Sequence, residues 1–183
     1  MSTATNVSAA KPAAGGAIYV APVGTTLPTD ATTALNAAFK SLGYVSEDGT
    51  TNASNMDTEV IRAWGKDPVL TLYNDREDTF KFNLIEVLNV DVLKLVYGDS
   101  NVTGALATGI TVEVNGGALA EHSIVIDMIM RNGALKRVVI PSASVTSVGE
   151  ITYSDSAAVG YDTTVTCMAD SDGNYHYEYI VRA

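Results

Sequence analysis

Short runs of alternating apolar and polar residues recur along most of the chain and predict β-strands. The clearest run covers residues 78–86, in which Phe80, Phe82 and Leu84 alternate with polar residues. A period of two is expected where one face of a strand is buried and the other faces water. The same pattern, or a short apolar run bounded by turn residues, predicts further strands over residues 17–21, 43–45, 68–73, 110–114, 121–131, 134–140, 145–153, 161–168 and 175–181.

Two of the connections between these strands have turn chemistry. Asn132 and Gly133 separate two predicted strands, and this pair favours the positive φ angles of a tight hairpin. The charged segment 74–77 is predicted to be the turn that joins the strands at 68–73 and 78–86.

A single segment, residues 89–98, predicts an α-helix. Asn89 can cap it, Asp91 suits its positive N-terminal end, and Gly98 can end it. Because β-branched residues lower its helix propensity, the helix needs packing against a sheet. Residues 29–39 predict at most a short helical turn. The expected fold is therefore mainly β with an α+β character: a β-sandwich or β-barrel with one flanking α-helix.

Two polar segments stand apart from this pattern. Residues 1–15 are small and polar and predict a flexible N-terminal arm, followed by a single β domain over residues 16–183. The longest polar stretch, residues 46–57, predicts an extended loop, and it leads to Trp64, the only tryptophan. A loop of this length inside a compact domain is usually functional.

The composition argues against a general nucleic-acid binder. The 183 residues carry 11 Lys and Arg against 21 Asp and Glu, a net charge of −10, and only 17% of them are charged. With one cysteine, the chain cannot form an internal disulfide or a zinc site of several thiolates. It has no signal-peptide pattern and no apolar run long enough to span a membrane, which predicts folding in a reducing cytoplasm and no membrane partner.

Candidate catalytic and metal-binding residues each have a simpler structural interpretation. Cys167 with His122 or His176 could form a nucleophile and its base, but all three lie in predicted strands without the spacing of a metal site. The acidic segment 170–174 is similar to a calcium loop but lacks the spacing of an EF-hand and is better interpreted as a hairpin turn. Lys136 and Arg137 fall on opposite faces of a strand. We therefore predict no catalytic residue, metal or cofactor.

Asp127 interrupts an apolar run, residues 124–130, that is apolar on both faces of its predicted strand. If one of these faces were open to water, it would mark an interaction surface. The pattern therefore favours oligomerisation through this strand, and the alternative is a strand buried within its own domain.

The order of the motifs resembles a known family. DREDTFKF at residues 75–82, IDMIMRNGALKR at 126–137 and VGEITYSD at 148–155 are its most specific blocks. From about residue 16 the chain is similar to the major tail proteins, or tail tube proteins, of bacteriophages with long, non-contractile tails.

This resemblance implies a structural virion protein with no catalytic residues and no cofactor. Its copies would form hexameric rings that stack into the tail tube, after assembly in the host cytoplasm. The implied partners are further copies of the chain, the tape-measure protein, tail-terminator and baseplate proteins, and double-stranded DNA in transit without specific binding. Two alternatives are another tube-forming protein, from a contractile-tail inner tube or a type VI secretion ring, and a decoration or receptor-binding domain of a virion.

The resemblance also implies roles for two groups of residues. The segment 47–64 matches the extended loop that makes contacts between rings, and its candidates are Glu47, Asp48, Asn52, Asn55, Asp57 and Trp64. For Trp64, an interface anchor and a core residue are equally good interpretations. An acidic lumen would repel DNA and let it slide, and the candidates for its lining are Asp75, Glu77, Asp78 and Asp127.

Overall fold

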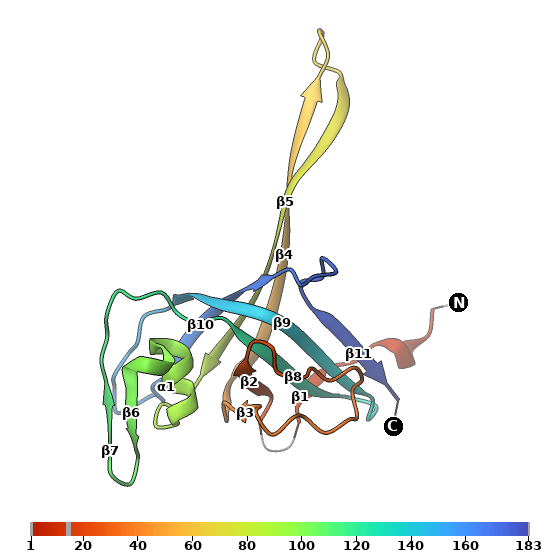
Figure 1. The fold of residues 1–183 in the computed structure, drawn as a ribbon. Helices are drawn as coiled ribbons and strands as arrows, with labels where there is room; N and C mark the ends of the chain where they lie inside the picture. Colours follow the sequence, from red (N-terminus) through yellow and green to blue (C-terminus); the bar gives the residue numbers. More distant parts are fainter. Residues whose placement is uncertain (1, 14–15, 183) are drawn as a thin grey trace.

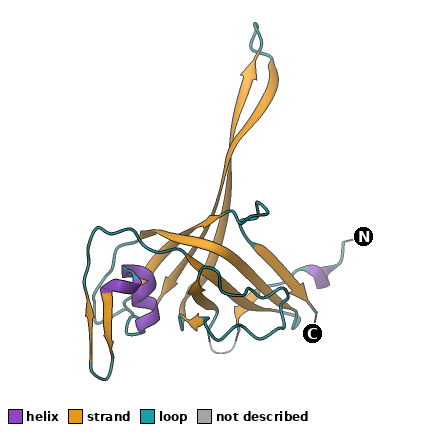
Figure 2. Ribbon diagram, in the orientation of Figure 1, coloured by secondary structure: helices purple, strands orange, loops and turns teal. Residues whose placement is uncertain are grey.

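A computed structural model describes residues 2–13 and 16–182, and about half of these residues lie in antiparallel strands (Figures 1 and 2). The strands are β1 (Ala10–Pro12), β2 (Ile18–Pro22), β3 (Lys40–Ser41), β4 (Val45–Arg62), β5 (Pro68–Leu84), β6 (Val102–Ala105), β7 (Gly109–Val112), β8 (His122–Met130), β9 (Leu135–Val148), β10 (Tyr161–Met168) and β11 (Tyr177–Val181). In the described part, one α-helix, α1 (Val90–Tyr97), is joined by two short 3₁₀ turns, Ala4–Asn6 and Asp99–Asn101. The predicted fold class, mainly β with one helix, is confirmed.

The main sheet has nine strands and does not close into a barrel. Its path runs β3-β2-β8-β9-β10-β5-β4, and β6 and β7 form a separate pair. Two strands each pair with two shorter strands along different parts of their length. Strand β8 pairs with β1 and β2, and the long strand β9 pairs with β10 and β11. All of these pairs are antiparallel.

Helix α1 packs on the main core, as its β-branched sequence requires. Its buried residues Val92, Leu93, Leu95 and Val96 join a cluster that includes Phe82 of β5 and residues of β2, β8 and β9. The Asn89 side chain accepts a hydrogen bond from the Asp91 amide at 3.0 Å. Gly98 follows the helix with φ +102°, an angle that side chains rarely adopt. The predicted helix and its boundary residues are confirmed.

Strand β8 is buried on both faces by its own chain. Ile124 and Ile126 lie in the main core, whereas Val125 belongs to a second cluster with Phe39 and Val139. Leu27, Leu35 and Ala38 pack against this second cluster, so the segment around residues 27–39 covers the face that the sequence left open. Residues 29–39 contain no helix, only a single turn in which the Phe39 amide donates to the Asn36 carbonyl at 2.9 Å. From His122 to Ile126 the strand is buried within its own domain, as the alternative interpretation expects, whereas residues 127–130 are half-buried. Oligomerisation through this strand stays a prediction.

The predicted hairpin around Asn132 and Gly133 is confirmed as the connection of β8 and β9. Residues 131–134 form the connection, which is closed by hydrogen bonds from the Gly133 amide to the Met130 carbonyl at 2.9 Å and from the Met130 amide to the Ala134 carbonyl at 2.8 Å. Of the two predicted turn residues, only Gly133 has positive φ, +81°. The predicted strands at 134–140 and 145–153 are one continuous strand, β9, which ends at Val148.

The N-terminal arm is partly paired. Residues Ala10–Pro12 form β1 against β8, and the Asn132 side chain donates to the Thr5 carbonyl at 3.0 Å. The arm was predicted to be flexible over residues 1–15, of which residues 1, 14 and 15 lie outside the described residues.

Two loop predictions are wrong. Residues 46–57, predicted as a loop, belong to β4, and the predicted turn at 74–77 lies inside β5. The two strands pair continuously from Thr50 opposite Phe82 to Arg62 opposite Pro68, with irregularities after Asp57 and after Ile61. Apolar and polar residues alternate along a strand when one of its faces is buried. Because these parts of β4 and β5 have water on both faces, their sequences show no period of two.

Candidate functional site

A long β-hairpin built from β4 and β5 projects from the body of the molecule (Figure 1). Every residue from 51 to 77 is exposed, whereas Asp78 and the rest of β5 enter the core. The hairpin turns at residues 63–67, where Gly65 has φ +105° and Lys66 has φ +72°. Hydrogen bonds from Ala63 to the Asp67 carbonyl and from Lys66 to the Ala63 carbonyl close the turn at 2.8 and 2.9 Å.

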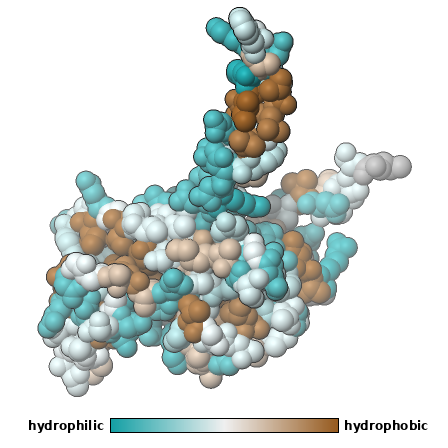
Figure 3. Space-filling model, turned by 45° about the horizontal axis from the view of Figure 1, so that its top comes forward, coloured by the Kyte–Doolittle hydropathy of each residue, from teal (hydrophilic) through white to brown (hydrophobic). Residues whose placement is uncertain are grey.

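The distal part of this hairpin is apolar and exposed. We call residues 58–73 the distal hairpin, and Figure 3 shows its apolar residues as a brown band on the projection. Large hydrophobic side chains that normally lie in a core are open to water here: Val60, Ile61, Trp64, Val69, Leu70, Leu72 and Tyr73. A contiguous exposed apolar surface of this kind marks an interaction site.

The stem below it, residues 51–57 and 74–77, is polar and acidic on one face. Asp57 lies directly opposite Asp75, and Asn55 lies opposite Glu77. None of these three carboxylates forms an ion pair with another described residue. Like charges placed opposite each other destabilise a strand pair, so this face costs the isolated chain some stability.

The predicted contact residues of segment 47–64 are spread along the hairpin. Glu47 and Asp48 lie at its base, Asn55 and Asp57 lie on the stem, and Trp64 stands fully exposed at the tip. A core role for Trp64 is therefore excluded in the single chain. Asn52 has a different role from the others, because its side chain binds a buried carboxylate.

That buried carboxylate is Asp78, at the root of the hairpin. It has no exposed surface; its Oδ1 accepts a hydrogen bond from Asn52 Nδ2 at 2.8 Å, and its Oδ2 is hydrogen-bonded to His176 Nδ1. The ring of His176 also meets Phe80 edge to face, with centroids 5.3 Å apart. As a lumen-lining residue, Asp78 is thus a wrong assignment, since its carboxylate is buried and hydrogen-bonded within the chain.

Asp127 is compensated within the chain. Its two carboxylate oxygens accept hydrogen bonds from Nε and Nη2 of Arg137 at 2.6 and 2.8 Å, and this pairing raises the pKa of Arg137. Nη1 of the same guanidinium donates to the carbonyls of Thr33 at 2.7 Å and Asp30 at 3.1 Å. The pair therefore holds the segment that covers β8. Of the four predicted lumen acids, only Asp75 and Glu77 carry exposed, unpaired charges.

Among the described residues, no hydrogen bond joins Cys167 to His122 or His176. Burial, with a smaller contribution from Asp78, raises the pKa of the Cys167 thiol to about 12, which is the opposite of what a nucleophile needs. His122 lies opposite Ala143 of β9, which is also the partner of Cys167 of β10, and His122 Nε2 is 3.3 Å from Asp99 Oδ2. Among residues 2–13 and 16–182 there is no group of three or more His, Cys, Asp or Glu that could hold a metal ion. No helix in this part is long and apolar enough to cross a membrane.

The acidic segment 170–174 is a turn, as predicted. Asp170 accepts hydrogen bonds from the amides of Asp172 and Asn174, both at 2.9 Å, and from the Tyr177 hydroxyl at 2.5 Å. These bonds lower the pKa of Asp170, chiefly through Tyr177. The Asp170 carboxylate therefore stabilises the connection between β10 and β11.

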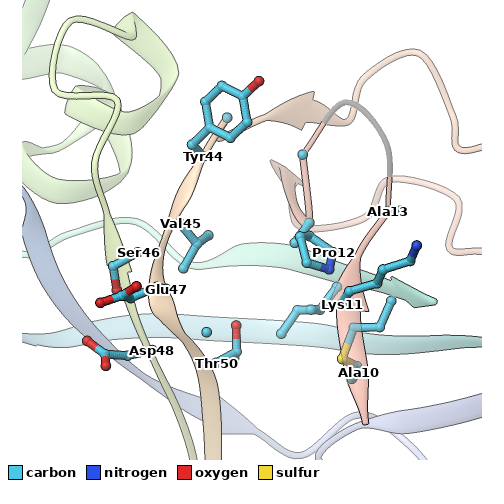
Figure 4. A pocket seen from close by; sticks show the side chains of 16 residues that line it. Ala10, Lys11, Pro12, Ala13, Tyr44, Val45, Ser46, Glu47, Asp48 and Thr50 are labelled. Carbon is cyan, nitrogen blue, oxygen red and sulfur yellow. The ribbon is translucent and has the colours of Figure 1, made fainter. Parts of the chain in front are cut away.

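A groove of about 590 Å³ lies between β1 and the beginning of β4 (Figure 4). Pro12 and Met128 line one wall, and Val45 and Thr50 line the other. Figure 4 shows Glu47 and Asp48 on the far side of β4, away from β1. Each of the two strands pairs on one side only among the described strands, so the groove is the place where the sheet fails to close.

The comparison with protein families agrees with this architecture. Residues 3–183 match the family described as phage tail tube protein. The chain belongs to the phage tail tube proteins. Members of this family are structural components of the virion tail. No curated protein sequence matches the chain.

Proposed function

We propose that this tail tube protein assembles in the host cytoplasm into hexameric rings, and that the rings stack into the tube of a long, non-contractile tail through which DNA enters the host. The observation that carries the proposal is the exposed hairpin of β4 and β5 with its apolar distal part. The tape-measure protein would occupy the lumen, and tail-terminator and baseplate proteins would bind the two ends of the tube.

The energetics of the hairpin support self-assembly. An isolated two-stranded hairpin is only marginally stable in water, and every residue from 51 to 77 is exposed in the single chain. Burial of its apolar side chains against other copies would stabilise it at about 25 cal/mol per Å² of apolar surface. A contact between unlike surfaces of identical copies closes into rings or repeats along a filament.

The charge distribution supports passive transit of DNA. Asp75 and Glu77 are exposed and unpaired on the stem, and the chain as a whole carries −10. An acidic lumen repels the phosphate backbone and lets DNA slide without sticking. We therefore keep Asp75 and Glu77 as the lumen-lining candidates.

Electron microscopy of the purified protein tests the proposal. We expect concentrated wild-type protein to form six-fold tubes, with Asp75 and Glu77 facing the axis in a reconstruction. A variant in which Asn-Gly replaces residues 58–73 should remain folded by circular dichroism but form no tubes. Wild-type protein that stays monomeric at high concentration, or normal tubes from the shortened variant, would contradict the assembly role. Stem acids on the outer wall would contradict the lumen assignment alone.

A further inference from the structure

Strand β5 has two different sequence patterns along its length. From Thr79 to Leu84, buried Phe80, Phe82 and Leu84 alternate with more polar residues. This is the pattern of a sheet with one covered face. From Val69 to Tyr73, the sequence Val-Leu-Thr-Leu-Tyr does not alternate, although the strand is continuous. The pattern of one-sided burial is therefore present in the core part of β5 and absent from its part in the distal hairpin.

The register of the hairpin assigns its apolar side chains to two faces. Residues directly opposite each other in an antiparallel pair share a face. Ile61 opposite Leu70 and Glu59 opposite Leu72 form the first face. The second face holds Val60 opposite Thr71 and Thr58 opposite Tyr73.

Both faces expose large apolar side chains. Ile61, Leu70 and Leu72 are 41%, 53% and 38% exposed on the first face, and Val60 and Tyr73 are 41% and 76% exposed on the second. A surface that covers only one face would leave the other apolar side chains in water. The pattern requires cover on both sides of the ribbon.

The charges of the distal hairpin fit copies of the same chain as the cover. Residues 58–73 contain two acidic residues, Glu59 and Asp67, and two basic residues, Arg62 and Lys66, so this section is neutral in a chain of net charge −10. Its burial between acidic copies is therefore not opposed by like charge. Neither Arg62 nor Lys66 forms an ion pair with another described residue, and both are available to acids of a neighbour.

We propose that the distal hairpin of each copy inserts between two surfaces contributed by neighbouring copies, with the Ile61 face against one and the Val60 face against the other. This inference rests on the proposed assembly into tubes and adds that the contact is two-sided. The hairpin is then a wedge held between its neighbours, and loss of either covered face prevents assembly.

Cysteine labelling of adjacent positions on opposite faces tests the two-sided contact. Leu70→Cys and Thr71→Cys place one thiol on each face, and the native Cys167 is buried and protonated. We expect maleimide to label both positions quickly in monomers and at least about tenfold more slowly in assembled tubes, since the thiols are then out of water. Slow labelling at one position and unchanged labelling at the other would overturn the proposal.

Paired substitutions provide a second, independent measurement. Ile61→Thr with Leu70→Thr removes the apolar character of the first face, and Val60→Thr with Tyr73→Thr removes that of the second, while threonine keeps β propensity. Both double variants should fail to assemble. Normal tubes from either variant would refute two-sided burial and leave the assembly proposal intact, whereas a failure of the wild type to form tubes would refute the assembly proposal itself.

Discussion

His176 is hydrogen-bonded to the fully buried carboxylate of Asp78 at the root of the projecting hairpin. The histidine comes from the connection between β10 and β11, and Asn52 of β4 binds the other carboxylate oxygen at 2.8 Å. Three segments distant in sequence thus meet at the residue where β5 leaves water and enters the core. The polar network fixes the root from which the exposed ribbon projects.

Removal of the Asp78 carboxylate should destabilise the folded chain. We expect Asp78→Ala to lower the free energy of unfolding by about 3 kcal/mol, because it leaves His176 and Asn52 without their shared partner. Urea denaturation of the monomer measures this. Asp75→Ala, three residues earlier on the exposed stem, is the matched control and should change the value by less than about 0.5 kcal/mol. Equal effects of the two substitutions would contradict a structural role for the network.

The Asp127 and Arg137 pair should show strong coupling. Asp127→Ala should cost about 3 to 5 kcal/mol, because it leaves the guanidinium buried without a counter-charge. Asp127→Ala combined with Arg137→Met should cost less than the sum of the two single substitutions. A double-mutant cycle by urea denaturation measures the coupling, and additive costs would show that the two side chains act independently.

The Cys167 thiol predicts a decline in stability at alkaline pH. Burial raises the pKa of this thiol in the folded chain from its ordinary 9.0 to about 12, so between these values the unfolded chain loses a proton that the folded chain keeps. The free energy of unfolding should then fall by at most about 1.4 kcal/mol per pH unit from this group.

Comparison with Cys167→Ala isolates that contribution. Burial also raises the pKa of Tyr161 to about 12, and the tyrosine remains in both proteins. Denaturation curves between pH 8 and 11 should therefore show a steeper decline for the wild type than for the variant. Parallel curves would mean that the thiol titrates normally.

Substitution of Trp64 should separate folding from assembly. The side chain is fully exposed at the tip, so Trp64→Ala should leave the free energy of unfolding within about 0.5 kcal/mol of the wild type. The concentration needed for tube formation should rise at least about tenfold, since exposed tryptophans are common anchors of interfaces. Light scattering during assembly measures this concentration. Trp64→Phe keeps an aromatic ring, so the concentration it needs for tube formation should lie between those of the wild type and Trp64→Ala. If Trp64→Ala needs the same concentration as the wild type, Trp64 does not take part in the contact.

The cap of α1 offers a local test of a prediction that the sequence made correctly. Asn89 accepts from the Asp91 amide and donates to the Ser41 carbonyl at 3.3 Å. Asn89→Ala should lower the free energy of unfolding by about 1 kcal/mol, whereas Asn89→Ser keeps an uncharged cap acceptor beside Glu86 and should recover most of the loss. Equal losses in the two variants would assign the effect to the hydrogen bonds that Asn89 Nδ2 donates to Ser41 and Glu86.

Local chemistry explains which elements could be predicted from the chain. Phe80, Phe82 and Leu84 share a covered face, Asn89 and Gly98 bound the helix, and Gly133 supplies the positive φ of a hairpin. Each of these signals depends on residues a few positions apart. The motifs at 75–82 and 126–137 also led to the tail tube family before any tertiary contact was known.

Contacts between distant segments were decided only by the tertiary structure. Residues 46–57 form a strand because β5 supplies hydrogen-bond partners for their backbone. Their side chains do not alternate between apolar and polar, so the sequence does not predict this strand. Asp78 and Asp127 resemble exposed acids in the sequence, but in the structure Asp78 is buried and hydrogen-bonded to His176, and Asp127 forms an ion pair with Arg137. The sequence alone determined the fold class, the helix and the family, because these follow from local patterns. Burial, pairing and the long projecting hairpin depend on which segments meet in space.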